Sequence, residues 1–270
     1  MSMTDLKNAH GSRINFALEW LRTTTQSIKK DFYSLNSYKQ KEDCSEVTDT
    51  DLRIEREFRK KIKTSFPSDA VTGEEFGASS TEAEYTWTID PIDGTRGYVH
   101  GVPFFGTMVG LYISNTPIFG AINYPALGEM VYAVHEYGCY WLSDQIEGLK
   151  VCKISNTGSL TDSVAGYSGF EYFKKTSTED QFYRLLRECK FARTWGDCYG
   201  YCLLIQGKID LVVEPALKLW DTVPLQVLVK EAGGLMLDIK GESPSIGFDS
   251  AVIGNARLVR DFLAASSQAM

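Results

Sequence analysis

The chain has 270 residues, of which 43% are hydrophobic, 12% aromatic and 23% charged, a composition that excludes disordered and fibrous proteins. Its 28 basic and 35 acidic residues give a net charge of −7, which disfavours nucleic acid as a partner because phosphate neutralisation needs clustered basic residues. No apolar stretch approaches the roughly 18 residues of a membrane span, so we expect no membrane partner.

Two amphipathic helices are predicted near the N-terminus, where no signal or transit peptide is recognisable. Apolar residues follow a 3.6-residue period from Ser12, which can cap the helix, to about Tyr33, and again from near Thr48 to Ser65. The basic residues between Arg59 and Lys63 fit the solvated face of the second helix. The polar residues 36–46 between the helices indicate a mobile loop.

The middle of the chain has the pattern of β-strands. A short strand is predicted from Tyr85 to Asp90, ending at Pro91, and two hairpins follow it. Sequential hairpins predict a largely antiparallel sheet. The hairpin strands are expected at Phe104–Ile113, Pro117–Tyr124, Met130–Glu136 and Gly138–Leu142.

The second half of the chain alternates strands and helices, as layered α/β proteins do. Strands are expected at Val164–Tyr167, Phe191–Thr194, Ile209–Glu214, Leu235–Asp238 and Ala251–Ile253. Helices are expected at Thr178–Cys189, Tyr199–Gln206, Thr222–Ala232 and Asn255–Ala264. The polar stretch Ser143–Gly148 predicts a division into sub-domains 1–145 and 146–270 that form one compact unit.

The six cysteines are scattered along the chain. No C-x-x-C pair occurs, and with only three histidines a zinc site has little support. We therefore expect reduced thiols in a cytoplasmic protein. The cysteines are residues 44, 139, 152, 189, 198 and 202.

Acidic residues lie at positions where packing does not require them. Glu74 follows a glycine, and a turn after the predicted strand can bring the carboxylates of Asp90 and Asp93 to one point. Carboxylates that lie so close together repel each other unless a proton or a cation lies between them. Because oxygen ligands suit it, Mg²⁺ is the predicted cation.

Gly94 and Thr95 follow these acids directly. Glycine lets the backbone approach a ligand closely, and successive N–H groups at a helix start can hold an anion. A further acid, Asp221, stands after Trp220 at the start of a predicted helix. Metal ions that bridge the protein to a phosphate explain these features together. The alternative is an ordinary turn, since D-P-x-D-G is good turn chemistry, but this does not account for Glu74 and Asp221.

These motifs resemble the signatures of the inositol monophosphatase family of Mg²⁺-dependent, lithium-sensitive phosphatases. The resemblance runs from the first helix to the last strand, and it rests on Gly73-Glu74-Glu75, Asp90-Pro-Ile-Asp-Gly-Thr95 and Trp220-Asp221 with Glu231-Ala-Gly-Gly234. It implies a layered α-β-α-β-α sandwich, usually a homodimer, that binds two or three Mg²⁺ ions. It also implies hydrolysis of a small phosphorylated metabolite by metal-activated water.

The resemblance also assigns roles to residues. Glu74 and Thr95 position or activate the water, and Asp51 is an acid close to it. The amides of Gly94 and Thr95 hold phosphate, and Asp197, Glu214 and Asp221 contact the substrate. Lys41 matches a loop lysine of several family members, although it can equally be an ordinary surface lysine. The implied metal ligands are Glu74, Asp90, the carbonyl of Ile92, Asp93 and Asp221.

Two segments are most similar to the histidinol-phosphatase-type branch of the family. They are Gly94-Thr-Arg-Gly-Tyr-Val-His-Gly101 and Gly196-Asp-Cys-Tyr-Gly-Tyr201, although Gly97 departs from the alanine often found in that branch. The cationic groups of histidinol phosphate suit the carboxylates of Asp197 and Glu214, which inositol hydroxyls can also use as hydrogen-bond acceptors. Histidinol phosphate is therefore the expected substrate.

Other functions remain open at this point. Within the family, the alternatives are an inositol-1-monophosphatase and a bisphosphate nucleotidase. From a different class, the chain can be a non-catalytic regulatory protein on the same scaffold, but all four metal carboxylates are present, which favours an active enzyme. A phosphoaspartyl mechanism needs D-x-D, and Asp90 and Asp93 are one residue too far apart. A serine hydrolase is disfavoured because Ser168 lacks a G-x-S-x-G context.

Overall fold

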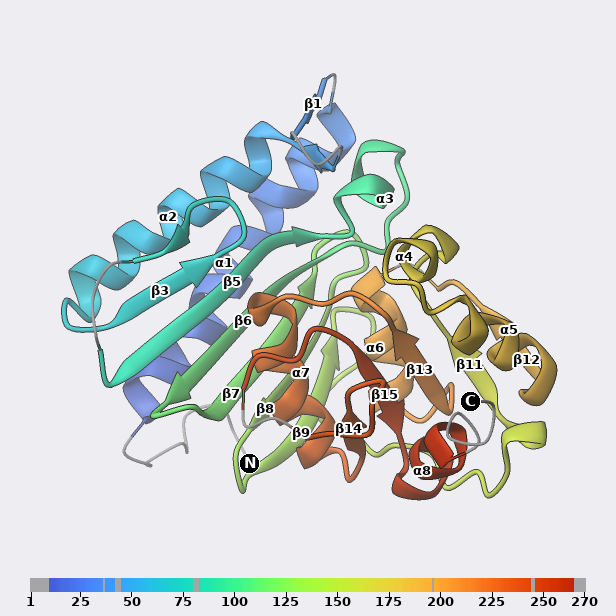
Figure 1. The fold of residues 1–270 in the computed structure, drawn as a ribbon. Coiled ribbons are helices and arrows are strands. Elements are labelled where there is room, and N and C mark those ends of the chain that lie inside the picture. The colour runs from blue at the N-terminus through green and yellow to red at the C-terminus, as the bar shows by residue number, and fades with distance from the viewer. Residues whose placement is uncertain are drawn as a thin grey trace.

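The computed structural model describes residues 10–35, 37–41, 45–79, 83–195, 197–243 and 246–264. Two sheets alternate with three layers of helices, in the order α-β-α-β-α (Figure 1). This confirms the predicted layered sandwich. Within the described residues, no helix is both long and apolar enough to cross a membrane.

The larger sheet has eight strands in the order β10-β9-β8-β7-β6-β5-β3-β4. All neighbouring strands are antiparallel except β3 and β5, which are parallel. The hairpins are where the sequence predicts them, but the pattern missed the short strands β3, β4 and β10. The strands are β3 (Ala70–Gly73), β4 (Gly77–Ala78), β5 (Tyr85–Asp93), β6 (Gly106–Ile113), β7 (Thr116–Tyr124), β8 (Glu129–Val134), β9 (Gly138–Ser143) and β10 (Lys150–Val151).

Helices α1 (Gly11–Ser34) and α2 (Asp49–Ser65) cover the outer face of this sheet (Figure 1). The N-cap of α1 is His10, so the expected cap, Ser12, is instead inside the helix. Thr48 caps α2 as part of a capping box with Asp51. Between the helices, the expected loop contains a small antiparallel hairpin of β1 (Lys39–Gln40) and β2 (Glu46–Val47).

The smaller sheet has five strands in the order β12-β11-β13-β15-β14. The first three are parallel, and β15 is antiparallel to both of its neighbours. The parallel strands therefore have their carboxyl ends at one edge of the sheet. The strands are β11 (Val164–Gly166), β12 (Phe191–Arg193), β13 (Leu211–Glu214), β14 (Leu235–Leu237) and β15 (Ala251–Gly254).

The remaining helices separate the sheets or cover the smaller one (Figure 1). Helices α6 (Asp197–Ile205) and α7 (Leu219–Glu231) lie between the sheets. Helices α4 (Phe170–Lys175), α5 (Glu179–Glu188) and α8 (Ala256–Ala264) cover the outer face of the smaller sheet. The short helix α3 (Thr95–Val99) follows β5. The sequence pattern missed α3 and α4 because they are too short to show a helical period.

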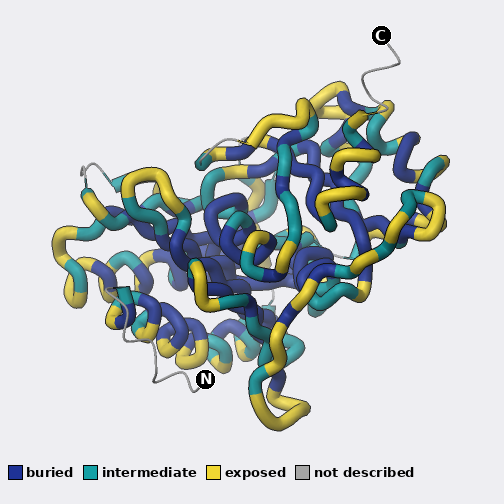
Figure 2. Tube along the Cα trace, turned by 90° about the horizontal axis from the view of Figure 1, so that it is seen from below, coloured by how far each residue is buried: buried dark blue, intermediate teal, exposed yellow. Residues whose placement is uncertain are grey.

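Three hydrophobic clusters fill the spaces between these layers. One joins α1 and α2 to the larger sheet, one surrounds α6 and α7, and one joins the smaller sheet to its outer helices. Central strands contribute to two clusters, since Met108 of β6 faces α7 while Val109 faces α1 and α2. Buried residues accordingly occupy the middle of the molecule, and exposed residues lie on its outer helices and loops (Figure 2).

Helix α7 packs on the larger sheet at a pair of glycines. Gly110 of β6 and Gly120 of β7 are directly opposite each other. A Cβ atom on Gly120 would lie 2.2 Å from the carbonyl oxygen of Pro224, and one on Gly110 would lie 2.6 Å from a Val223 methyl group. The two glycines therefore allow the backbone of α7 to approach the sheet closely.

We predict that Gly120→Ala lowers the free energy of unfolding by about 3 kcal/mol or more, because neither backbone can move aside without disturbing both layers. Gly200→Ala is the matched control, since a Cβ atom there meets no atom within 4 Å and alanine favours the helix. Chemical denaturation measures both variants. Equal stability of the two variants would contradict the proposed close packing.

Candidate metal and phosphate site

Three carboxylates meet between the two sheets. Asp90 and Asp93 belong to the carboxyl end of β5, and Asp221 belongs to the first turn of α7. One carboxylate oxygen from each lies within 4.8 Å of the others. The structure thus brings together three of the acids that the sequence singles out.

A β-bulge, and not a turn, places Asp90 and Asp93 together. Asp90 pairs with Met108 and Asp93 with Gly106, so β5 has one more residue than β6 in this interval. Side chains three residues apart on a regular strand point to opposite faces, and the extra residue restores them to one side. The expected end of the strand at Pro91 is wrong. Pro91 continues β5, and its carbonyl accepts a hydrogen bond from Thr107 Oγ1 at 2.8 Å.

The carboxylates of this cluster repel one another in a buried environment. Burial, followed by the charge of Glu74, raises the pKa of Asp90 well above its usual value. Burial and then Asp197 raise the pKa of Asp93 to about 7, and burial and then Asp93 raise that of Asp221. Asp90 Oδ1 is buried without a hydrogen-bond partner among the described residues. A set of oxygen donors with one unsatisfied buried oxygen fits a divalent cation.

Glu74 lies beside this cluster because β3 and β5 are parallel. Gly73 pairs with Ile89, and the N–H of Glu74, the residue after β3, donates a hydrogen bond to the Ile89 carbonyl at 3.2 Å, which places Glu74 near Asp90. Lys41 Nζ lies 2.9 Å from Glu74 Oε1 and 2.7 Å from Glu75 Oε1. Lys41 is therefore an ion-pair partner of the site and not an isolated surface lysine.

Thr95 and Asp51 form the next part of the site. Thr95 Oγ1 donates a hydrogen bond to the Ile92 carbonyl at 2.8 Å and lies 3.4 Å from Asp51 Oδ1. The other Asp51 oxygen accepts hydrogen bonds from the backbone N–H of Thr48, at 2.9 Å, and from its hydroxyl group. Burial raises the pKa of Asp51 to about 6. The capping of α2 thereby fixes Asp51 beside Thr95.

Gly94 connects the acidic cluster to α6. Its φ of 82° is in the left-handed region, and a Cβ atom there would lie 2.9 Å from Asp197 Oδ2, so only glycine fits. Asp197 begins α6, and the next residue, Cys198, donates its N–H to Asp93 Oδ2 at 2.7 Å. Asp197 is thus adjacent to the backbone that is expected to hold phosphate.

Glu214 stands at the carboxyl end of β13. It is buried. Burial, and then the charges of Asp197 and Asp93, raise its pKa to about 8. Asp197 and Asp93 are therefore close enough to act on the charge of Glu214.

We predict that Glu214→Gln stabilises the metal-free protein more at pH 8.5 than at pH 5. The folded pKa of about 8 exceeds the ordinary value of 4.5, so stability is lost as the pH rises between these values. Glutamine has no proton to lose, and the melting-temperature difference from the native protein should therefore grow by several degrees. The exposed Glu147→Gln is the control. A melting-temperature difference that does not depend on pH would contradict the raised pKa of Glu214.

Two residues that support the site, Glu55 and Glu75, have no role that the sequence motifs predict. Glu55 of α2 accepts hydrogen bonds from the backbone N–H groups of Glu75, at 2.7 Å, and Phe76, at 3.2 Å. It thereby holds the loop that carries Glu74. The sequence offers no distinct signal for it, because Glu55 stands among the other charged residues of α2, and only the structure shows that it is buried. Glu75 is the second missed residue, since it shares Lys41 with Glu74.

Comparison with known proteins identifies relatives along almost the whole chain. The model of the inositol monophosphatase family matches residues 11–270. A histidinol-phosphatase of Chlorobaculum parvum is 30% identical over 93% of this chain and 95% of its own, and one of Streptomyces coelicolor is 33% identical over 83% and 84%. The solved inositol monophosphatase of Zymomonas mobilis is 26% identical, with a TM-score of 0.83 over 97% of this chain and 100% of its own. The chain belongs to the inositol monophosphatase family, and it is a phosphoric monoester hydrolase of that metal-dependent family.

Proposed function

We propose that this enzyme hydrolyses histidinol phosphate with the help of Mg²⁺. The observation that carries the proposal is the convergence of Asp90, Asp93 and Asp221, with its unsatisfied buried oxygen, beside two further acids, Asp197 and Glu214. The cluster suits metal ions and phosphate, and the further acids suit a substrate that carries positive charge.

Two or three Mg²⁺ ions would be held by the acidic cluster. When bound, the ions supply the positive charge that acidifies water and neutralises the leaving oxygen of a phosphate ester. The oxygen donors present suit Mg²⁺, which prefers carboxylates and carbonyl groups to softer ligands. The proposed ligands are Glu74, Asp90, the carbonyl of Ile92, Asp93 and Asp221.

The residues around the cluster would position water and phosphate. Thr95 Oγ1, fixed by Ile92 and Asp51, orients the attacking water together with Glu74. The backbone amides of Gly94 and Thr95 hold phosphate oxygens at the start of α3. Asp221 would be a metal ligand and would also contact the substrate.

The preference for histidinol phosphate is supported by the relatives and by charge. Three relatives at 30–33% identity are named histidinol-phosphatase. Asp197, which lies against Gly94, and Glu214 add two carboxylates around the cluster, and these would pair with the ammonium and imidazole groups of the substrate. Inositol 1-phosphate is the second candidate, since a relative from Aquifex aeolicus, 29% identical, is named fructose-1,6-bisphosphatase/inositol-1-monophosphatase.

A phosphate-release assay tests this proposal directly. The purified chain is incubated with Mg²⁺ and histidinol phosphate, inositol 1-phosphate, 3′-phosphoadenosine 5′-phosphate or fructose 1,6-bisphosphate in turn. We expect the highest kcat/KM with histidinol phosphate. A preference for another ester would reject histidinol phosphate as the substrate. If no ester releases phosphate, a non-catalytic role on this scaffold is favoured.

We predict direct attack of water on phosphorus, without a phosphorylated enzyme. Asp90 and Asp93 both belong to the proposed metal site, so neither is available as a nucleophile. Rapid quenching of a reaction with ³²P-labelled substrate should leave no radioactivity on the protein. A phosphorylated aspartate in the quenched protein would reject this mechanism.

We also propose that the enzyme is a homodimer and that residues 1–145 and 146–270 are its sub-domains. This division would place Asp90 and Asp93 in one sub-domain and Asp197, Glu214 and Asp221 in the other. Light scattering after gel filtration tests the dimer, and proteolysis within Ser143–Gly148 tests the division. A monomeric mass would reject the homodimer. Cleavage at another place in the chain would reject the proposed division into sub-domains.

A further inference from the structure

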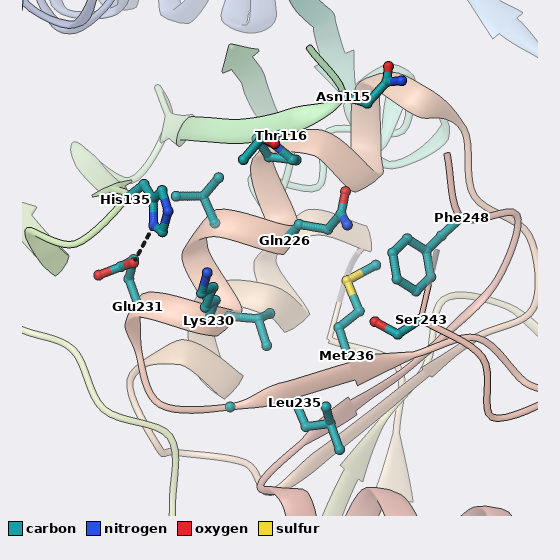
Figure 3. Close-up of a pocket in the computed structure, with 14 residues that line it drawn as sticks. Asn115, Thr116, His135, Gln226, Lys230, Glu231, Leu235, Met236, Ser243 and Phe248 are labelled. Carbon is teal, nitrogen blue, oxygen red and sulfur yellow. Dashed lines mark hydrogen bonds and ion pairs between the residues drawn. The ribbon is translucent and has the colours of Figure 1, made fainter. Parts of the chain in front are cut away.

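A pocket of about 380 Å³ lies at the carboxyl end of α7 (Figure 3). Asp221 stands in the first turn of this helix, whereas Lys230, nine residues later, lines the pocket. At a rise of 1.5 Å per residue the two positions are about 13 Å apart along the helix. A ligand in this pocket would therefore not contact the acidic cluster.

The lining of the pocket is divided into an apolar part and a polar part (Figure 3). Met236 and Phe248, both buried, lie on one side, and Gln226 projects between the two parts. His135, Lys230 and Glu231 lie on the other side. Such a pocket suits a molecule with an apolar body and one polar end.

Both carboxylate oxygens of Glu231 already have hydrogen-bond partners. Its carboxylate accepts hydrogen bonds from the backbone N–H groups of Glu136 and Gly138, both at 2.9 Å, and lies 3.5 Å from His135 Nδ1. These contacts fix the turn between β8 and β9. They also orient the imidazole ring, so its other nitrogen points away from Glu231.

Lys230, in contrast, has no carboxylate partner in the part of the chain that the structure describes. The last carbonyl groups of α7 do not neutralise it, because they accept hydrogen bonds from the turn that follows. The acceptors are Leu228, Val229 and Lys230, and the donors are Ala232, Gly233 and Gly234. The Lys230 ammonium group is therefore the charged group of the pocket that is left to pair with a ligand.

We propose that this pocket binds a small organic anion, a carboxylate with an apolar or aromatic body. The carboxylate lies against the Lys230 ammonium group and the His135 ring, and the body packs on Met236 and Phe248. The thioether of Met236 adapts to the shape of the body.

Methyl NMR with two matched probes tests the proposal. 2-Naphthoate carries the predicted negative charge, and 2-naphthamide has nearly the same shape without it. Both are titrated into the protein labelled at the methionine methyl groups, with Met236→Leu identifying the Met236 signal. We expect naphthoate to shift the Met236 signal and to bind at least about fivefold more tightly than the amide.

Lys230→Gln should remove this difference between the probes without changing the melting temperature, since Lys230 is exposed. Lys61→Gln, on the exposed face of α2, is the control and should bind like the native protein. Saturating inorganic phosphate with Mg²⁺ should not displace naphthoate. An unshifted Met236 signal, equal affinity of native protein and Lys230→Gln, or displacement by phosphate would each overturn the proposal.

Discussion

Replacing Asp93 with asparagine is expected to lower kcat/KM about 100- to 1000-fold while the protein remains folded. The substitution removes one negative charge from the proposed metal site, and bound metal contributes several kcal/mol to the transition state. The amide oxygen of asparagine can still accept the Cys198 N–H, which now lies 2.7 Å from Asp93 Oδ2. The attachment of α6 to β5 is therefore retained.

Stability measurements separate this loss of activity from misfolding. Without Mg²⁺ the variant should unfold at the same temperature as the native protein or higher, because one repulsive charge is absent from a buried cluster. Mg²⁺ should raise the melting temperature of the native protein more than that of the variant. Asp180→Asn, exposed on α5, is the control and should keep full activity. If the Asp93→Asn variant turns over substrate as fast as the native protein at ordinary Mg²⁺ concentrations, the assignment of Asp93 to the metal site is rejected.

The parts of this fold that the sequence predicts are those with a clear local signal. The periodic helices and the hairpins are found within a few residues of their predicted bounds. Thr48 also caps the helix that was expected to begin near it. The acidic motifs predict that Asp90, Asp93 and Asp221 converge. Asp93 ends β5 and Asp221 lies in the first turn of α7, and such positions are set by local sequence.

The parts that could not be predicted depend on contacts between distant segments. The bulge in β5 is set by its pairing with β6, and it is invisible in the spacing of Asp90 and Asp93. Likewise, Gly110 and Gly120 gain their importance only when α7 packs against them. Glu55 resembles any other acid of a charged helix until its hydrogen bonds to the loop after β3 are known.

The choice between substrates depends on the two acids beyond the metal cluster. Phosphate and metal ions are held in the same way for any monoester, so discrimination must come from groups that face the rest of the substrate. Asp197 begins α6 beside Gly94, and Glu214 ends β13. The Glu214 pKa of about 8 applies to the site without cations, and Mg²⁺ or a cationic substrate would favour its carboxylate form.

We predict that Asp197→Asn and Glu214→Gln each lower kcat/KM for histidinol phosphate by roughly ten- to a hundredfold. A hydrogen bond to a charged group contributes about 1.5–3 kcal/mol, and the ammonium group of this substrate would lose such a partner. A neutral aryl phosphate has no cationic group that could pair with these acids, so its kcat/KM should change less than about threefold. Steady-state phosphate release with both esters, on the native protein and both variants, makes the comparison. If kcat/KM for both esters falls equally in the variants, the two acids support the site in general, and the assignment of a cationic substrate fails.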